Sequence, residues 1–202
     1  LRVQVAYLVS RYYYPPRLQE LLDALWTMGV RNYPVIGPFS DVVADTMEEA
    51  EHSYGTENVI AFQVEQLRRF RPLVAVGHDR EGEYGHGAHR ISALALEQSV
   101  VRAADASYQN WSAGQYGTWD TPKLYLHFAG ENPIVLDVET PLSSFGGLTA
   151  FEVASAAMLR HESQLQYAHR PTLESEEFPR YDCRRFGLVR SLVGADTGND
   201  IM

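Results

Sequence analysis

The stretch PLVAVGHDREGEYGHGAHR, residues 72–90, determines how this chain is interpreted. Its apolar beginning, residues 72–77, is typical of a short buried strand. A polar loop containing glycines follows, and a helix is expected to begin near His86. Open α/β sheets bind their ligands where a strand ends in such a loop and continues into a helix. We therefore expect the functional site in residues 78–90.

Two histidines of this stretch have the spacing of neighbours on one helix face. His86 and His89 are three positions apart, so their side chains project from the same side of a helix. Two imidazoles on one face can bind a metal, or one can bind it while the other handles charge on a substrate. Histidines also cap helices and satisfy core hydrogen bonds, so the pair alone leaves these uses open. The helix start is expected to offer free N–H groups and a partial positive charge, which favour an anionic ligand.

Strands and helices alternate along much of the chain. Apolar and β-branched runs predict strands at residues 2–9, 33–36, 73–76, 123–128, 133–138 and 183–193. Helical spacing of apolar residues predicts helices at residues 18–28, 46–71 (in two pieces, broken around Tyr54 and Gly55), 86–107 and 149–164. Three successive strand–helix alternations indicate a parallel sheet with helices on both sides.

We therefore predict an α/β fold with a Rossmann-like, mainly parallel sheet, helices on both of its faces, and C-terminal strands that form a small additional sheet or hairpin. Gly37 and Pro38 are expected to end the second strand, and residues 129–132 to form a hairpin-like connection. Thr149, three residues before Glu152, has the spacing of a capping box. With no repeat and no convincing linker, a single domain over residues 1–202 is expected.

Composition excludes several classes of function. The net charge of −9 and the pI of about 5.2 argue against a nucleic-acid binder and leave no polybasic patch for membranes. The single cysteine, Cys183, excludes an internal disulfide framework and a cysteine-rich zinc module. No apolar run approaches the roughly 18 residues that a membrane span needs. There is no signal-peptide pattern, but the sequence begins inside an expected strand, so secretion is not excluded; the location stays unknown, with the cytoplasm favoured.

The segment GEYGHGAH, residues 82–89, resembles the GxYGHxxH histidine motif of the PIG-L/LmbE-like de-N-acetylases. Other segments are similar to family features: Arg17 and Glu20 to an R-x-x-E helix that ends in Leu-Gly-Val, residues 39–41 to the loop after the next strand, and residues 161–164 to a late H-x-S-Q. The resemblance covers most of the chain. It implies a zinc-dependent hydrolase that removes the N-acetyl group from an N-acetylglucosamine-type sugar or glycoconjugate.

The resemblance also implies roles for individual residues. His89 matches the family's zinc ligand, so the expected cofactor is Zn²⁺ or another divalent metal. His86 matches a histidine that stabilises the oxyanion or assists the leaving amine, and Tyr84 a mobile tyrosine that helps to polarise the acetyl carbonyl. Arg17 matches an arginine that contacts the substrate, although a pair with Glu20 is an equal alternative. The expected partner is an amino-sugar or glycoconjugate small molecule.

Other polar residues are assigned structural roles or none. Asp79, Glu81 and Glu83 are interpreted as loop-ordering or solvated carboxylates, and His78 as structural. His161 and Gln164 are expected in helix packing, with pocket lining as the alternative. The remaining histidines carry no signal of function: His52, His127 and His169.

The family's His-Pro-Asp-Asp motif, which supplies two metal ligands and a general base, does not occur in these residues. Either the first strand and its motif lie outside the sequence given, or the chain has lost the metal site. We favour the first explanation, because in a 3-2-1-4-5 sheet that strand is central, and its two neighbours would otherwise leave backbone groups unpaired.

Two alternative functions stay open. The chain could be a non-catalytic carbohydrate-binding or interaction domain in which His86 and His89 only line a pocket, with the aromatic segments 12–16 and 108–119 stacking on sugar. It could also be a different metal-dependent hydrolase on a similar scaffold, because fold does not fix substrate.

Overall fold

A computed structural model describes residues 2–10, 15–165 and 182–195. The chain divides into two compact units. Unit 1 comprises Leu1–Asp41 and Asp137–Cys183, and unit 2 comprises Val42–Leu136 and Arg184–Met202. The predicted α/β class is confirmed, with six α-helices in the described part and two separate sheets. The expectation of a single domain stays a prediction, and each unit is described by itself.

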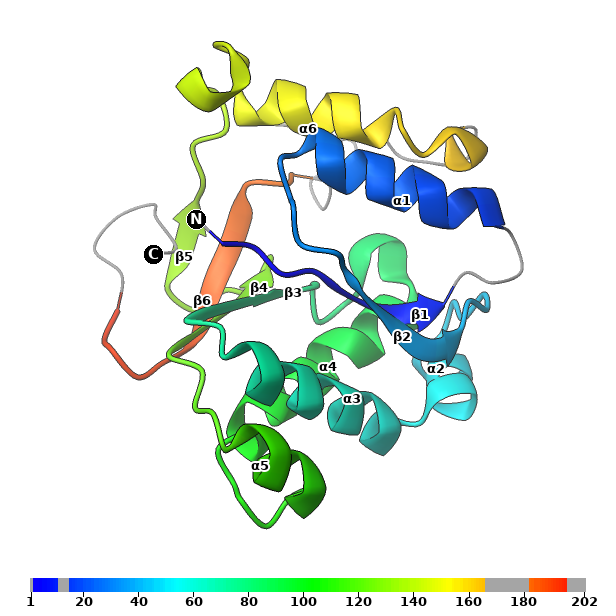
Figure 1. Cartoon of the computed structure of the whole chain (residues 1–202), viewed down its shortest axis with the longest axis vertical. Helices are drawn as coiled ribbons and strands as arrows, with labels where there is room; N and C mark the ends of the chain where they lie inside the picture. The colour runs from blue at the N-terminus through cyan, green and yellow to red at the C-terminus, as the bar shows by residue number, and fades with distance from the viewer. Residues whose placement is uncertain (1, 11–14, 166–181, 196–202) are drawn as a thin grey trace. The chain divides into compact units, whose positions relative to one another are not determined.

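Unit 1 is built on a parallel pair of strands, β1 (Ala6–Ser10) and β2 (Val35–Ser40), with helix α1 (Pro15–Thr27) between them in the sequence. Helix α6 (Ala150–Met158) lies alongside α1 (Figure 1). Two 3₁₀ turns complete the unit, η2 (Ser143–Phe145) and η3 (Glu162–Gln164). Leu21 and Leu25 of the apolar stripe predicted for α1 are buried, together with Ala24, whereas Trp26 of the same stripe is exposed.

Strand β2 does not end at Gly37 and Pro38, and the prediction of its end is wrong. The strand continues to Ser40 through a shift in register between the pairs Tyr7–Ile36 and Val9–Phe39. A proline is tolerated at such an irregularity because the ladder needs no N–H there. Gly37 is required for a separate reason, since a Cβ atom at this position would lie 2.0 Å from the carbonyl oxygen of Leu8.

Unit 2 contains a four-stranded sheet in the order β3-β4-β6-β5. Its strands are β3 (Val74–Gly77), β4 (Lys123–His127), β5 (Pro133–Val135) and β6 (Arg185–Ser191). Its helices are α2 (Met47–Tyr54), α3 (Thr56–Phe70), α4 (Gly87–Arg102) and α5 (Asn110–Tyr116), and a 3₁₀ turn, η1 (Glu83–Gly85), precedes α4. Helices α3 and α4 pack against each other and bury Ile60, Val64 and Ile91.

The second sheet is mixed rather than mainly parallel. Strands β3 and β4 are parallel, as predicted, but β6 runs antiparallel to both β4 and β5. The expected hairpin between residues 123–128 and 133–138 is therefore wrong, because β6 lies between the two strands. The chain turns widely through Phe128 and Asn132, which both have positive φ angles, and their backbone groups bond to β6 instead of to each other.

Local sequence signals predicted some helix boundaries and missed others. The break at Tyr54 and Gly55 is confirmed, and Gly55 adopts a φ of 69° between α2 and α3. Helix α4 ends at Arg102, five residues before the predicted 107, and α6 ends at Met158 rather than near Gln164. None of the described helices combines the length and the apolar character that a bilayer span requires.

The predicted capping box at the start of α6 is confirmed. Thr149 Oγ1 accepts a hydrogen bond from the Glu152 N–H at 3.1 Å, and Glu152 Oε2 accepts one from the Thr149 N–H at 2.8 Å. We expect Thr149→Ala to lower the free energy of unfolding by about 1 kcal/mol, because two amide donors at the helix start lose a partner or its orientation. Urea denaturation measures this change, with Thr118→Ala at an exposed loop position as the control. Equal losses in the two variants would contradict a specific capping role.

Candidate active site

The loop between β3 and α4 is held by two of its own charged residues. Asp79 is buried, its carboxylate accepts the Glu81 N–H at 2.9 Å, and its carbonyl accepts the Gly82 N–H at 2.9 Å. Arg80 donates to both carboxylate oxygens of Glu97 in α4, at 2.6 and 3.0 Å. It also bonds to Glu131 at 2.7 Å. The loop-ordering role predicted for Asp79 is confirmed, and Arg80 fastens the same loop to α4.

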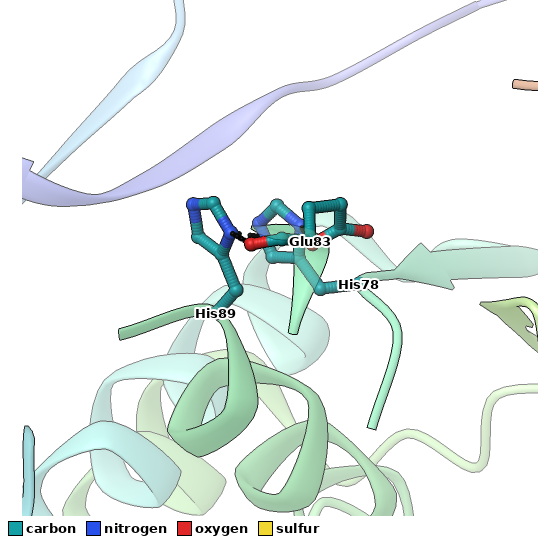
Figure 2. A group of neighbouring side chains, drawn as sticks. All are labelled: His78, Glu83 and His89. Atoms are coloured by element: carbon teal, nitrogen blue, oxygen red, sulfur yellow. Dashed lines mark hydrogen bonds and ion pairs between the residues drawn. The ribbon is translucent and has the colours of Figure 1, made fainter. Parts of the chain in front are cut away.

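Glu83, which belongs to this loop, is surrounded by three histidines. Its Oε2 atom is 2.6 Å from His78 Nδ1 and 3.4 Å from His89 Nδ1. Its Oε1 atom is 3.1 Å from His127 Nδ1 and accepts the Asp79 N–H at 3.1 Å. Figure 2 shows the polar ends of His78, Glu83 and His89 meeting at one point. The carboxylate is largely buried, with 17% of the side chain exposed.

Electrostatics in this cluster favour an ionised carboxylate and a neutral His89. Burial raises the pKa of Glu83, but hydrogen bonds with His127 and His78, the charge of His78 and the Asp79 N–H together hold that pKa well below its usual range. Burial lowers the pKa of His89, and the nearby His78 acts in the same direction, while Glu83 opposes both. Neutral imidazole and ionised carboxylate are the forms that bind metal ions.

His86 and Tyr84 lie beside this cluster. The ring of His86 is 5.4 Å from that of His89, as expected for neighbours, although His86 is the N-cap of α4 and has an extended backbone. Tyr84 meets His86 edge to face at 6.1 Å. Tyr84 has a φ of 61°, an uncommon conformation for a residue other than glycine, of the kind that clusters at functional sites. The structure thus brings together three of the predicted site residues, whose roles stay predictions.

The first N–H groups of α4 are already bonded. The Gly87 N–H donates to the Asp45 carbonyl at 3.1 Å and the Ala88 N–H to the Ala44 carbonyl at 3.3 Å. The expectation of free N–H groups for an anionic ligand is therefore wrong at these two positions. The close approach requires a glycine, since a Cβ atom at Gly87 would lie 1.9 Å from the Thr46 carbonyl oxygen.

Unit 1 brings together three segments that carry the family resemblance. Arg17 pairs with Asp41 at 3.6 Å rather than with Glu20. Glu20 accepts hydrogen bonds from the Ser163 N–H at 2.9 Å and the Ser163 hydroxyl at 2.7 Å. The R-x-x-E helix therefore contacts both the loop after β2 and the H-x-S-Q turn. The substrate-binding role of Arg17 stays a prediction.

Comparison with known proteins gives relatives of one kind. No protein-family model matches the chain. It is 29% identical, over 90% of its length, to "1D-myo-inositol 2-acetamido-2-deoxy-alpha-D-glucopyranoside deacetylase 2" of Saccharopolyspora erythraea. It is 26% identical, over 54% of its length, to similarly named deacetylases of Catenulispora acidiphila and Geodermatophilus obscurus. The resemblance to the PIG-L/LmbE-like de-N-acetylases is confirmed. The matches cover 74% of the first relative but 35% and 39% of the other two.

A de-N-acetylase of this kind needs a metal ion, and the cluster around Glu83 fits one. One possible ligand atom from each of His78, Glu83 and His89 lies within 4.8 Å of the others. Glu83 Oε2 is buried and lies 2.6 Å from His78 Nδ1 and 3.4 Å from His89 Nδ1, while His89 Nδ1 also bonds to the Glu83 carbonyl at 3.1 Å. This buried anionic oxygen would attract a cation. Imidazole nitrogen and carboxylate oxygen are donors that divalent metals accept.

Three members of the cluster were missed in the sequence: His78, Glu83 and His127. For two of them the only signal in the sequence was a position at the end of a predicted strand. His78 directly follows β3 and His127 ends β4, and the parallel register pairs Gly77 with Leu126. The two histidines therefore leave the sheet side by side. For Glu83, no signal in the sequence distinguished it from the neighbouring acidic residues. His169 and the tyrosines at 12–14 lie outside the described residues.

Proposed function

We propose that the chain is a metal-dependent N-deacetylase that hydrolyses the acetamide of an N-acetylglucosamine-type sugar or glycoconjugate. The observation that carries the proposal is the match of 90% of the chain to a protein named as a deacetylase of an acetamido sugar linked to inositol. The cluster at residues 78–89 supports it, because it gathers metal-binding donors and polar side chains that can act on a carbonyl group.

His89 would be the metal ligand that this chain supplies. A bound divalent ion would supply Lewis-acid polarisation of the acetyl carbonyl and make water a nucleophile at neutral pH. His86 is half exposed beside His89 and free of any capping bond, so its imidazolium can donate a hydrogen bond to the developing oxyanion. As the C–N bond breaks, this proton can pass to the leaving amine, and the protons lost by the attacking water go to solvent and back to His86, which leaves acetate and the free amino sugar. Tyr84 offers a second donor for the oxyanion.

The proposal is tested by amine release from N-acetylglucosaminyl-inositol and from N-acetylglucosamine. We expect turnover that a zinc chelator removes and added Zn²⁺ restores, because the metal provides the carbonyl activation. Chelator already saturated with Zn²⁺ is the control for effects of the chelator itself. Sugar binding without amine release would favour the carbohydrate-binding alternative. Turnover that survives complete metal removal would contradict the metal-dependent mechanism.

A further inference from the structure

We infer that Glu83 is a positioning residue for His89: it keeps the hydrogen of the neutral His89 ring on Nδ1 and thereby leaves Nε2 as the atom that can bind a metal ion. The use of His89 as a metal ligand rests on the proposed function, but the state of its ring can be measured without any metal. Glu83 is a support and not itself a ligand, because its carboxylate oxygens already contact donors of His78, His127 and Asp79.

Two oxygen atoms of Glu83 face the Nδ1 atom of His89. The main-chain carbonyl oxygen lies 3.1 Å from this nitrogen, and Oε2 lies 3.4 Å from it (Figure 2). Neither oxygen carries a hydrogen, because a carbonyl has none and the low pKa of Glu83 keeps its carboxylate ionised. A neutral imidazole has one N–H group and one nitrogen lone pair. With two acceptors at Nδ1, the hydrogen belongs on Nδ1 and the lone pair on Nε2.

The Nε2 atom of His89 is left available for a ligand. Within the described part of the chain, the polar contacts of this ring are made through Nδ1, and the side chain is 30% exposed. A metal-binding histidine commonly donates its other ring N–H to a carboxylate or a main-chain carbonyl, which fixes the tautomer and the ring orientation. Glu83 offers His89 both kinds of acceptor. Without them the hydrogen could move to Nε2, and the ring would have to change tautomer before that atom bound an ion.

The carboxylate of Glu83 is itself held by the ends of two strands. Oε2 lies 2.6 Å from Nδ1 of His78, which directly follows β3, and Oε1 lies 3.1 Å from Nδ1 of His127, which ends β4. The Asp79 N–H donates to Oε1 at 3.1 Å. Because β3 and β4 are paired in parallel, these contacts anchor both oxygens to one sheet edge. The sheet therefore fixes the residue that orients His89, which is the kind of rigid support that a functional side chain needs.

Ring stacking restrains His89 in a second direction. The rings of His78 and His89 lie 4.6 Å apart between centroids, with their planes 11° from parallel. Both Nδ1 atoms approach the same buried oxygen, Oε2 of Glu83. The stack restrains the tilt of the His89 ring, and the oxygens of Glu83 restrain its rotation. Together they specify one orientation and one tautomer.

Replacing Glu83 by glutamine changes the hydrogen bonding with little change in shape. An amide has a single acceptor oxygen, and the Asp79 N–H can only donate, so we expect this oxygen to stay at the position of Oε1. The amide NH₂ group then faces the Nδ1 atoms of His78 and His89. To accept from it, His78 must carry its hydrogen on Nε2. At His89 the NH₂ group competes with the Nδ1–H group, and we expect a mixture of both tautomers.

The test is the ¹⁵N spectrum of the histidine rings in the metal-free full chain at about pH 8, above the usual imidazole pKa of about 6.5. We expect the Nδ1–H form for His89 in the wild type, and mainly the Nε2–H form for the exposed reference His52. Glu83→Gln should switch His78 and leave His89 mixed. The matched control Glu81→Gln, at an exposed position of the same loop, should change neither ring. A wild-type His89 with its hydrogen on Nε2, or unchanged rings in a folded Glu83→Gln variant, would overturn the inference.

Zinc affinity, measured by competition with a chromogenic chelator, gives a second readout. Glu83→Gln should bind Zn²⁺ about 10–100-fold more weakly than the wild type, the usual effect of losing the partner of a metal-bound histidine. The absorption spectrum of bound Co²⁺ should keep its shape, and a changed spectrum would make Glu83 a ligand and overturn the positioning role. A wild-type chain that binds no zinc would contradict the metal-dependent function, while the ring spectrum would still decide the inference. If melting curves show that Glu83→Gln is unfolded, the wild-type ring spectrum decides it alone.

Discussion

Replacing His86 by alanine is expected to lower the turnover of deacetylation by about 100–1,000-fold and to leave zinc affinity unchanged. The size of the effect is that of removing one charged or polar donor from a developing oxyanion. The measurement is kcat from amine release at saturating substrate, together with the zinc affinity of the same preparation. His52→Ala, at an exposed position of α2, is the control for loss of a histidine in general.

The structure explains why turnover should fall while zinc affinity stays the same. His86 occupies the N-cap position of α4, but its side chain makes no capping bond, so its removal takes no hydrogen bond from the helix start. Its Nε2 atom lies 3.9 Å from Asp45 Oδ1, outside the cluster centred on Glu83. A His86→Ala variant that loses zinc affinity along with turnover would mean that His86, and not only His89, is a ligand. Unchanged turnover would remove His86 from the mechanism.

Local signals predicted the features of the fold that depend on neighbouring residues. The Gly55 break and the Thr149 capping box were correctly located because each is decided within a few positions of the chain. Strand order was not predictable in this way. Strand β6 pairs with β4 and β5 across a long stretch of sequence, and its alternating apolar residues fit an edge or an internal position equally well.

The candidate site also has features that depend on nearby residues, which were predicted, and features that depend on distant residues, which were not. Helical spacing predicted that His86 and His89 are neighbours, and their rings are 5.4 Å apart, although His86 has an extended backbone and precedes the helix. The approach of His127 to Glu83 depends on the register of β3 against β4 and on the conformation of the loop, which no spacing in the sequence reveals. The bonded N–H groups of α4 were missed for a related reason. Their acceptors belong to residues 44 and 45, which precede a different helix.

Arg68→Met is expected to lower the free energy of unfolding by about 3–5 kcal/mol, as for removal of one partner from a buried charged network. The Arg68 side chain is fully buried in α3. Its guanidinium donates five hydrogen bonds, four to main-chain carbonyls and one to the Ser112 hydroxyl, at distances from 2.6 to 3.2 Å. Three of the carbonyls belong to Arg102, Ala103 and Asp105, where α4 ends, so the positive charge also meets the negative end of the helix dipole.

Urea denaturation measures the loss, and two further variants identify its cause. Arg69→Met removes the same charge at the exposed neighbouring position and should change stability by about 0.5 kcal/mol or less. Arg68→Lys keeps the charge but offers three donors on a single nitrogen, which cannot reach acceptors spread from Arg102 to Ser112. The Arg68→Lys variant should therefore recover only a minor part of the stability that is lost in Arg68→Met. If Arg68→Lys were as stable as the wild type, the positive charge alone would account for the effect. The five hydrogen bonds of the guanidinium would then not be what holds α3, α4 and α5 together.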